Sequence, residues 1–256
     1  MFSKLLKYEL KSVGKWYFAL NASVIAISFF LGFSIKSIEN YAMNSSEVSA
    51  ARFAQLIPII LALMFGVLVA GAWIATFVII IRRFYKNLFG REGYLTLTLP
   101  VSSHQIILSK LLASFIWTAF NAIVLMIGIV LLILPISGVG QFLVNLPYLA
   151  GLLKPTEWVM FLLSMILSTF SGTLMIYLAI AIGQLFINKR ILMAFVAYFV
   201  LAIIVITVSE LTGNHFATNN SIDINLFNYS SVEAIVEGII FYFATHYLLK
   251  NKLNIQ

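Results

Sequence analysis

The residues of this chain that are able to do chemistry are few and scattered. The three histidines, His104, His215 and His246, lie in separate segments without metal-ligand spacing. The chain has no cysteine, which excludes thiol chemistry, disulfides and cysteine-based metal sites. It also lacks the Gly-x-x-x-x-Gly-Lys-Ser/Thr phosphate loop and the His-Glu-x-x-His and Gly-x-Ser-x-Gly motifs. We therefore predict no metal site, no cofactor bound by this chain and no enzymatic activity of its own.

Glu233 and Glu237 form the most polar pair inside an apolar segment. Their spacing places them on one face of a helix. Ser230 and Glu233 have the pattern of a capping box, which predicts a helix N-terminus at Ser230. Glu237 lies one turn further along, where a carboxylate in a membrane is costly and indicates a transport pathway or a partner. The alternative interpretation, an acid that reaches the outer membrane interface, stays open.

Composition identifies the class of protein in which these residues are set. Of the 256 residues, 62% are hydrophobic and 10% are charged, whereas globular proteins have about 45–50% apolar and about 25% charged residues. A soluble domain of this size cannot bury so much apolar surface. A soluble enzyme, a disordered chain and a fibrous protein are therefore excluded, and we predict an all-α membrane protein. The basic residues lie between apolar runs, so the net charge of +7 indicates membrane topology and no nucleic-acid partner.

Six segments are long and apolar enough to cross a lipid bilayer, since about 20 apolar residues span its core of about 30 Å. They are residues 16–35, 56–81, 111–136, 158–186, 191–208 and 232–249. Only the last contains Asp, Glu, Lys or Arg. Alternation of polar and apolar residues is absent, so helices rather than barrel strands are expected. We predict a single transmembrane domain over residues 1–256.

Lys and Arg predict the orientation of these spans. Thirteen of the 16 fall on one side, in residues 1–15, 82–110, 189–190 and 250–252, and the other side has Lys36, Arg52 and Lys154. Cytoplasmic segments carry such an excess, so both termini are predicted to be cytoplasmic. A secretory signal peptide is the rival interpretation of the first span, because residues 48–50 resemble a cleavage site. Its apolar core of 20 residues exceeds the usual 7–15 or so.

Two predicted cytoplasmic segments combine basic with apolar side chains. Residues 1–15 predict a basic amphipathic helix at the inner membrane surface, either as an anchor or also as a contact for a partner. Its lysines, Lys4, Lys7, Lys11 and Lys15, share one face. The loop of residues 82–110 mixes basic and apolar side chains, which either meet anionic lipid or dock another protein. Ser102 and Gln105 predict that the third helix begins inside this loop and continues through Lys110.

Further patterns concern helix packing. Small residues recur at every fourth position in residues 62–70 and 164–172, which lets helices approach closely within one subunit or across a dimer interface. The outer segment of residues 137–157 is apolar enough to re-enter the membrane, whereas residues 209–231 are polar and rich in Asn.

Two stretches carry a resemblance to a known family: KLLKYELKSVGKW at residues 4–16, and RFYKNLFGREGYLTLTLPVSSHQIILSKLL at residues 83–112. Together with the six spans they resemble the permease subunit of a bacterial ABC exporter of the type V fold, in a group of small Gram-positive permeases. The resemblance implies a coupling helix between the second and third spans that docks on a separate ATPase subunit. The docking residues that it implies are Arg83, Tyr85, Gly90, Arg91, Glu92, Gly93, Tyr94, Leu95 and Pro100. Arg91 stands where the family pattern usually has an acidic residue.

The resemblance also implies the partners and the location. ATP and Mg²⁺ would be bound by the ATPase subunit, and a second copy or a homologous permease would complete the transporter. The expected location is the plasma membrane of a bacterium. The resemblance does not imply a particular substrate.

Two other classes of function are open at this point. A stand-alone secondary transporter or small channel would use Glu237 for ion coupling. A membrane-bound lipid-modifying enzyme would need clustered Asp or His at the inner face, and the sequence shows no such cluster. The exporter permease is therefore the leading prediction.

Overall fold

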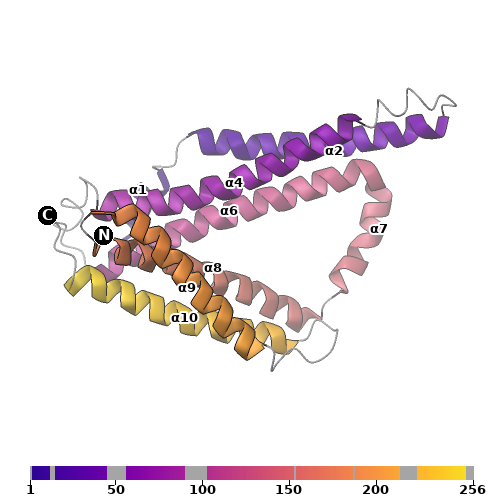
Figure 1. Cartoon of the computed structure of the whole chain (residues 1–256). Helices are drawn as coiled ribbons and strands as arrows, with labels where there is room; N and C mark the ends of the chain where they lie inside the picture. Colours follow the sequence, from indigo (N-terminus) through magenta and orange to yellow (C-terminus); the bar gives the residue numbers. More distant parts are fainter. Residues whose placement is uncertain are drawn as a thin grey trace. The chain divides into compact units, whose positions relative to one another are not determined.

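The computed structural model describes residues 2–11, 15–44, 56–89, 103–152, 154–186, 188–213 and 224–251. Within these ranges the chain forms eight helices and no strand (Figure 1), which confirms the predicted all-α class. The helices are α1 (Phe2–Lys11), α2 (Lys15–Asn44), α4 (Leu56–Phe89), α6 (Ser103–Ser137), α7 (Val139–Ala150), α8 (Pro155–Gly183), α9 (Arg190–Gly213) and α10 (Ile224–Asn251).

Six of these helices are long and apolar enough to cross a membrane, as predicted. The segments are Lys15–Tyr41, Leu56–Lys86, His104–Ser137, Pro155–Gly183, Arg190–Thr212 and Phe227–Asn251. Most exceed the predicted spans because the helices continue into the charged and polar residues that flank each apolar run. The apolar side chains on their outer surfaces are widely exposed, as expected where lipid replaces water as the solvent.

The predicted loop of residues 82–110 is mostly helical in the described part of the chain. Helix α4 continues to Phe89, and α6 is already helical from Ser103 and runs on through Lys110. The continuous start of the third spanning helix is thus confirmed, although Ser102 of the predicted capping box lies outside the described residues. The predicted coupling helix and the docking residues at positions 90–95 and 100 also lie outside them.

Of the predicted helix over residues 1–15, α1 covers Phe2–Lys11 and Lys15 begins α2, while residues 12–14 lie outside the described part of the chain. One predicted helix boundary is wrong. Ser230 does not cap α10, which begins at Ile224, and its hydroxyl donates to the Phe227 carbonyl inside the helix. The Phe227 ring packs against Phe161 of α8 at 5.6 Å, so tertiary contact extends α10 beyond the capping pattern.

The apolar outer segment after the third span forms a helix of its own. Gly138 separates α6 from α7 and has φ +77°, a conformation that glycine adopts without steric penalty. Helix α7 therefore turns away from the axis of α6 (Figure 1). None of the α7 side chains is buried.

The chain divides into two compact units. Unit 1 contains residues 1–12, 79–116 and 153–256, and unit 2 contains residues 13–78 and 117–152. The division falls inside α4 and inside α6. In unit 1, α10 packs mainly on α8, which also packs on α9.

In unit 2, α2 and α6 run parallel, as the first and third spans of an alternating topology must. Tyr17 lies against Trp117, with ring centroids 5.5 Å apart. Further along both helices, a Cβ on Gly32 would overlap the carbonyl oxygen of Leu132. The two backbones therefore approach closely at that end, and glycine is required there.

Candidate functional site

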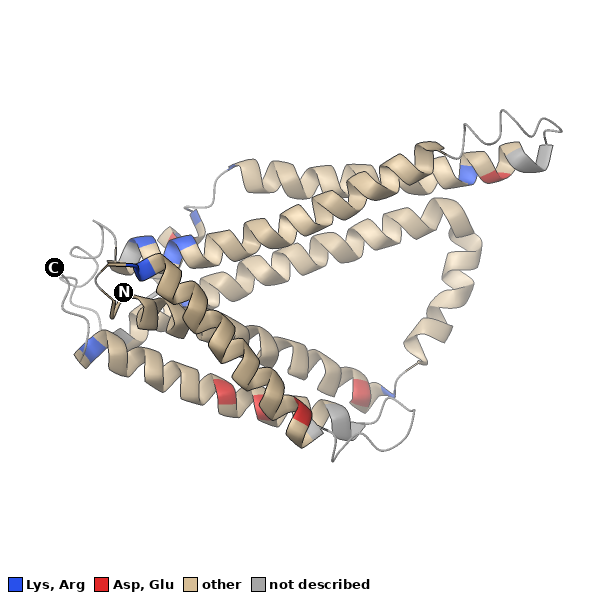
Figure 2. Cartoon of the chain, in the orientation of Figure 1, with Lys and Arg blue, Asp and Glu red and all other residues tan. Residues whose placement is uncertain are grey.

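Charges in unit 1 are separated along the helices (Figure 2). Lys and Arg gather where α4 and α10 end and where α6 and α9 begin, and the glutamates of α8–α10 gather at the opposite end. The basic end includes Arg82, Arg83, Lys86, Lys110, Arg190 and Lys250, and the acidic end includes Glu157, Glu210, Glu233 and Glu237. Lys154 is the exception, a cation at the acidic end that pairs with Glu157 at 3.7 Å. Such a separation matches the predicted difference between the two membrane sides.

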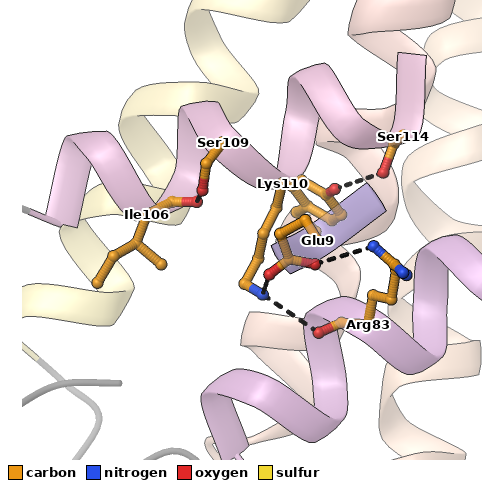
Figure 3. Close-up of polar contacts among 7 residues, drawn as sticks. Glu9, Arg83, Ile106, Ser109, Lys110 and Ser114 are labelled. Carbon is orange, nitrogen blue, oxygen red and sulfur yellow. Dashed lines mark hydrogen bonds and ion pairs between the residues drawn. The ribbon is translucent and has the colours of Figure 1, made fainter. Parts of the chain in front are cut away.

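Glu9 joins three helices at the basic end (Figure 3). Its Oε1 accepts a hydrogen bond from Nζ of Lys110 on α6 at 2.6 Å, and its Oε2 accepts one from Nη1 of Arg83 on α4 at 3.1 Å. Lys110 Nζ also reaches the Arg83 carbonyl oxygen at 3.4 Å. We call Glu9, Arg83 and Lys110 the ion triad. It ties α1 to the two helices that flank residues 90–102.

The ion triad is withdrawn from solvent. The Glu9, Lys110 and Arg83 side chains are 9%, 3% and 11% exposed. A buried charge is tolerated only with a partner of opposite sign and good hydrogen-bond geometry. One carboxylate here serves two cations, so the position of α1 is coupled to both α4 and α6. Such a triad specifies geometry more than it adds stability, since burying the charges offsets much of their attraction.

An apolar layer adjoins the ion triad. The Phe84 ring stacks on Tyr177 of α8, with centroids 3.9 Å apart and planes 7° from parallel. Tyr177 Oη also shares a hydrogen bond of 2.8 Å with Ser114 Oγ of α6. Ile106 and Ile107, which precede Lys110 on α6, are also buried. These contacts join α4 and α6 to α8 at this end.

Sequence reasoning missed the central residue of the ion triad. The four lysines of residues 1–15 predict a solvent-facing basic surface and say nothing of Glu9. One signal was available: Glu9 lies next to Leu10 and three residues after Leu6, on the apolar side of the amphipathic helix. A lone acid on the buried face of a basic helix predicts a buried cation opposite it.

A second polar cluster at the basic end joins α6 to α10. His104 Nδ1 and Tyr242 Oη are hydrogen bonded at 2.6 Å. The His104 and His246 rings stack with centroids 4.0 Å apart. No local pattern in the sequence indicates this pair. Nearly parallel rings direct their nitrogen lone pairs side by side rather than toward one point, so the pair is not arranged as a metal chelate.

The acidic end contains the predicted pathway residue, Glu237. Its Oε2 accepts a hydrogen bond of 2.9 Å from Ser171 Oγ on α8. One turn earlier, Glu233 Oε1 accepts one of 2.5 Å from Ser209 Oγ on α9. The two carboxylates thus join α10 to two different helices. This arrangement gives Glu237 a packing role, whereas a pathway role stays a prediction.

The implied docking residues within the described part of the chain are Arg83 and Tyr85. Arg83 is directed toward Glu9 inside the ion triad, so its contact is intramolecular. Tyr85 is half-buried, with its ring 6.3 Å from that of Phe89. Docking of another subunit on this segment therefore stays a prediction.

In the part of the chain that the structure describes, the small-residue face of α4 is exposed, whereas that of α8 is packed in part, since Ser164 is buried. A Cβ on Gly66 of α4 or on Gly172 of α8 would meet nothing within 4 Å. Ala62 and Ala70 are exposed as well. Packing within one subunit is thus not observed for the face on α4.

Comparison with known proteins finds no matching family model, curated protein or solved structure. The residues that the structure describes contain no group of three or more His, Cys, Asp or Glu able to hold a metal ion. The site is therefore characterised by its own geometry: a buried ion triad and an aromatic layer beneath a basic, amphipathic N-terminal helix.

Proposed function

We propose that this chain is the permease subunit of an ATP-driven exporter in the plasma membrane of a bacterium. In this proposal residues 82–110 dock a separate ATPase subunit, which binds ATP and Mg²⁺. A second permease copy, or a homologous permease, completes the assembly. The resemblance of residues 4–16 and 83–112 motivates the proposal, and the ion triad is the structural observation that supports it best.

The ion triad supports coupling because it lies at both ends of the docking segment. Arg83 precedes residues 90–102 on α4, and Lys110 follows them on α6. Glu9 holds both through hydrogen bonds of 3.1 and 2.6 Å. A force applied to the segment between them would therefore move α1, α4 and α6 together, as a rigid body rather than as a loose loop.

The aromatic layer extends this path. Because Tyr177 contacts both Phe84 and Ser114, a displacement of either flanking helix also acts on α8. The charge separation of unit 1 favours a cytoplasmic location for this end, and hence for both termini. A partner that supplies work from ATP would need to be on that side.

The test is co-purification with an ATPase encoded next to this chain's reading frame, combined with a transport assay. Tyr is enriched among residues that dominate binding energy, so Tyr94→Ala should cost about 2 kcal/mol or more of docking, roughly a 30-fold weaker affinity. Glu92→Ala should also weaken it. Tyr148→Ala is the matched control, because Tyr148 is an exposed tyrosine of α7. If Tyr94→Ala and Glu92→Ala both keep full binding and full transport, the docking role is wrong.

The alternative is a stand-alone secondary transporter or small channel that uses Glu237. Its support is the position of a carboxylate within the span Phe227–Asn251. The hydrogen bond from Ser171 accounts for that carboxylate by helix packing, so we favour the exporter permease.

A further inference from the structure

Three helices of unit 2 meet in a cluster of polar side chains where α2 begins. Tyr17 Oη on α2 and Thr76 Oγ1 on α4 share a hydrogen bond of 2.8 Å. Trp117 on α6 packs edge-on against Tyr17. Asn21 and Asn121 lie one turn further along α2 and α6. We call these five residues the polar seam.

The two asparagines lie at the same level of their helices. Tyr17 is beside Trp117, and a Cβ on Gly128 would lie 2.9 Å from Ser28 Oγ. The helices are thus parallel, with a constant offset of 100 residues between facing positions. Asn21 and Asn121 each follow the aromatic pair by four residues, one helical turn. They are 2% and 0% exposed, so both amides lie inside the seam.

The polar seam carries four buried atoms without a hydrogen-bond partner. These are the acceptors Asn21 Oδ1 and Asn121 Oδ1 and the donors Asn121 Nδ2 and Trp117 Nε1. Buried polar groups are rarely left in this condition, and in a membrane no surrounding solvent relieves it. Four such atoms within about one turn of two facing helices indicate a site that is built for a further hydrogen-bonding group.

We propose that the polar seam binds an uncharged amide or hydroxyl group of an amphipathic molecule. An amide has an N–H donor for one of the two acceptors and a carbonyl oxygen that accepts from one or both of the two donors, and a hydroxyl group both donates and accepts. Apart from Lys15, exposed at the start of α2, the described residues of unit 2 within two turns of the seam carry no charge. A cationic group there would have no counter-ion among these residues and would be strongly disfavoured. Phe18 and Phe120, whose rings are 5.7 Å apart, provide apolar contact for the rest of the ligand.

The helices are arranged so that this end can admit a ligand. Beyond the seam, Gly32 lies against the Leu132 backbone and Gly128 against the Ser28 side chain, so α2 and α6 approach closely there. The seam itself is formed by larger side chains, and in this proposal a ligand enters between them rather than at the glycines. This site does not depend on ATPase docking, so it stands apart from the proposed coupling role.

The absence of cysteine makes a direct test practical. Asn121→Cys places a single thiol in the polar seam, and Val24→Cys places one at a fully buried apolar position of α2. In lipid vesicles without any ATPase, the rate of modification by N-ethylmaleimide should be at least tenfold higher at position 121. The thiolate is the reacting species, and it does not form in an apolar, closed environment. Asn21→Cys is the second reporter if Asn121→Cys does not fold.

The ligand class is tested by protection of a thiol that leaves every polar atom of the seam in place. Ala72→Cys supplies it, since Ala72 is fully buried on α4 one turn from Thr76. Decanoyl-N-methylglucamide, an uncharged amphipath with an amide and hydroxyls, should slow the labelling at least threefold below its micellar concentration. Dodecyltrimethylammonium, a charged amphipath, should not. If the labelling rates at positions 121 and 24 are within twofold of each other, the polar seam is not an accessible binding site and the proposal is wrong. Equal protection by the two amphipaths would overturn the uncharged class.

Discussion

The ion triad makes α1 dependent on a single carboxylate, and Glu9→Gln tests this dependence. The substitution keeps the shape of the side chain but removes the charge shared by Lys110 and Arg83, at 2.6 and 3.1 Å. Removing one partner of a buried ion pair costs about 3–5 kcal/mol, because the other charge is left buried. The Gln amide oxygen still accepts a hydrogen bond, so we expect the lower value of about 3 kcal/mol.

The expected effect is local opening of α1 rather than global unfolding. With 1.36 kcal/mol for each tenfold change, a cost of about 3 kcal/mol raises the open population of α1 about 160-fold. Hydrogen–deuterium exchange of the α1 amides measures this population directly. Adding Lys110→Met to Glu9→Gln removes one uncompensated cation, and this should recover at least tenfold in protection.

Glu39→Gln is the matched control. Glu39 also pairs with a lysine at 3.1 Å, but the Lys36 and Glu39 side chains are 39% and 47% exposed. Exposed pairs contribute about 0–1 kcal/mol, so exchange in α2 should change by less than about fivefold. If exchange in α1 stays within threefold of the parent protein after Glu9→Gln, the ion triad does not hold α1 and the coupling argument fails.

Two further predictions concern helix packing, and both are read from thermal unfolding in detergent. Gly32→Ala should destabilise the protein by about 1–3 kcal/mol because its Cβ would overlap the Leu132 carbonyl oxygen. Gly66→Ala is the control: a Cβ there meets open space, so it should stabilise the protein by about 0.5–1 kcal/mol. Equal effects of the two substitutions would refute the close approach of α2 and α6. Ser171→Ala should destabilise by about 1 kcal/mol through loss of its hydrogen bond to Glu237. Glu237→Gln should cost less, since the amide oxygen still accepts that bond, and a larger cost than for Ser171→Ala would show that the carboxylate charge itself is needed.

The number and type of the spans followed from the sequence because the bilayer sets both. An apolar run of about 20 residues has only one way to satisfy its backbone in lipid. Six apolar runs therefore predicted six spanning helices, and the structure has them. Span ends were predicted less well: α10 begins at Ile224 rather than near Ser230, because Phe227 packs on Phe161. A capping pattern reports a local preference that such a tertiary contact overrides.

The residues that come together were decided by the tertiary structure. Glu9 is 101 residues from Lys110 and 74 from Arg83, and no local pattern relates positions so far apart. The same holds for His104 and His246, and for Asn21 and Asn121. Hydropathy and charge bias act along the chain and are read position by position. Partnership between polar side chains depends on the register in which helices pack, and that register is specified by contacts such as those of Gly32, which only the folded structure reveals.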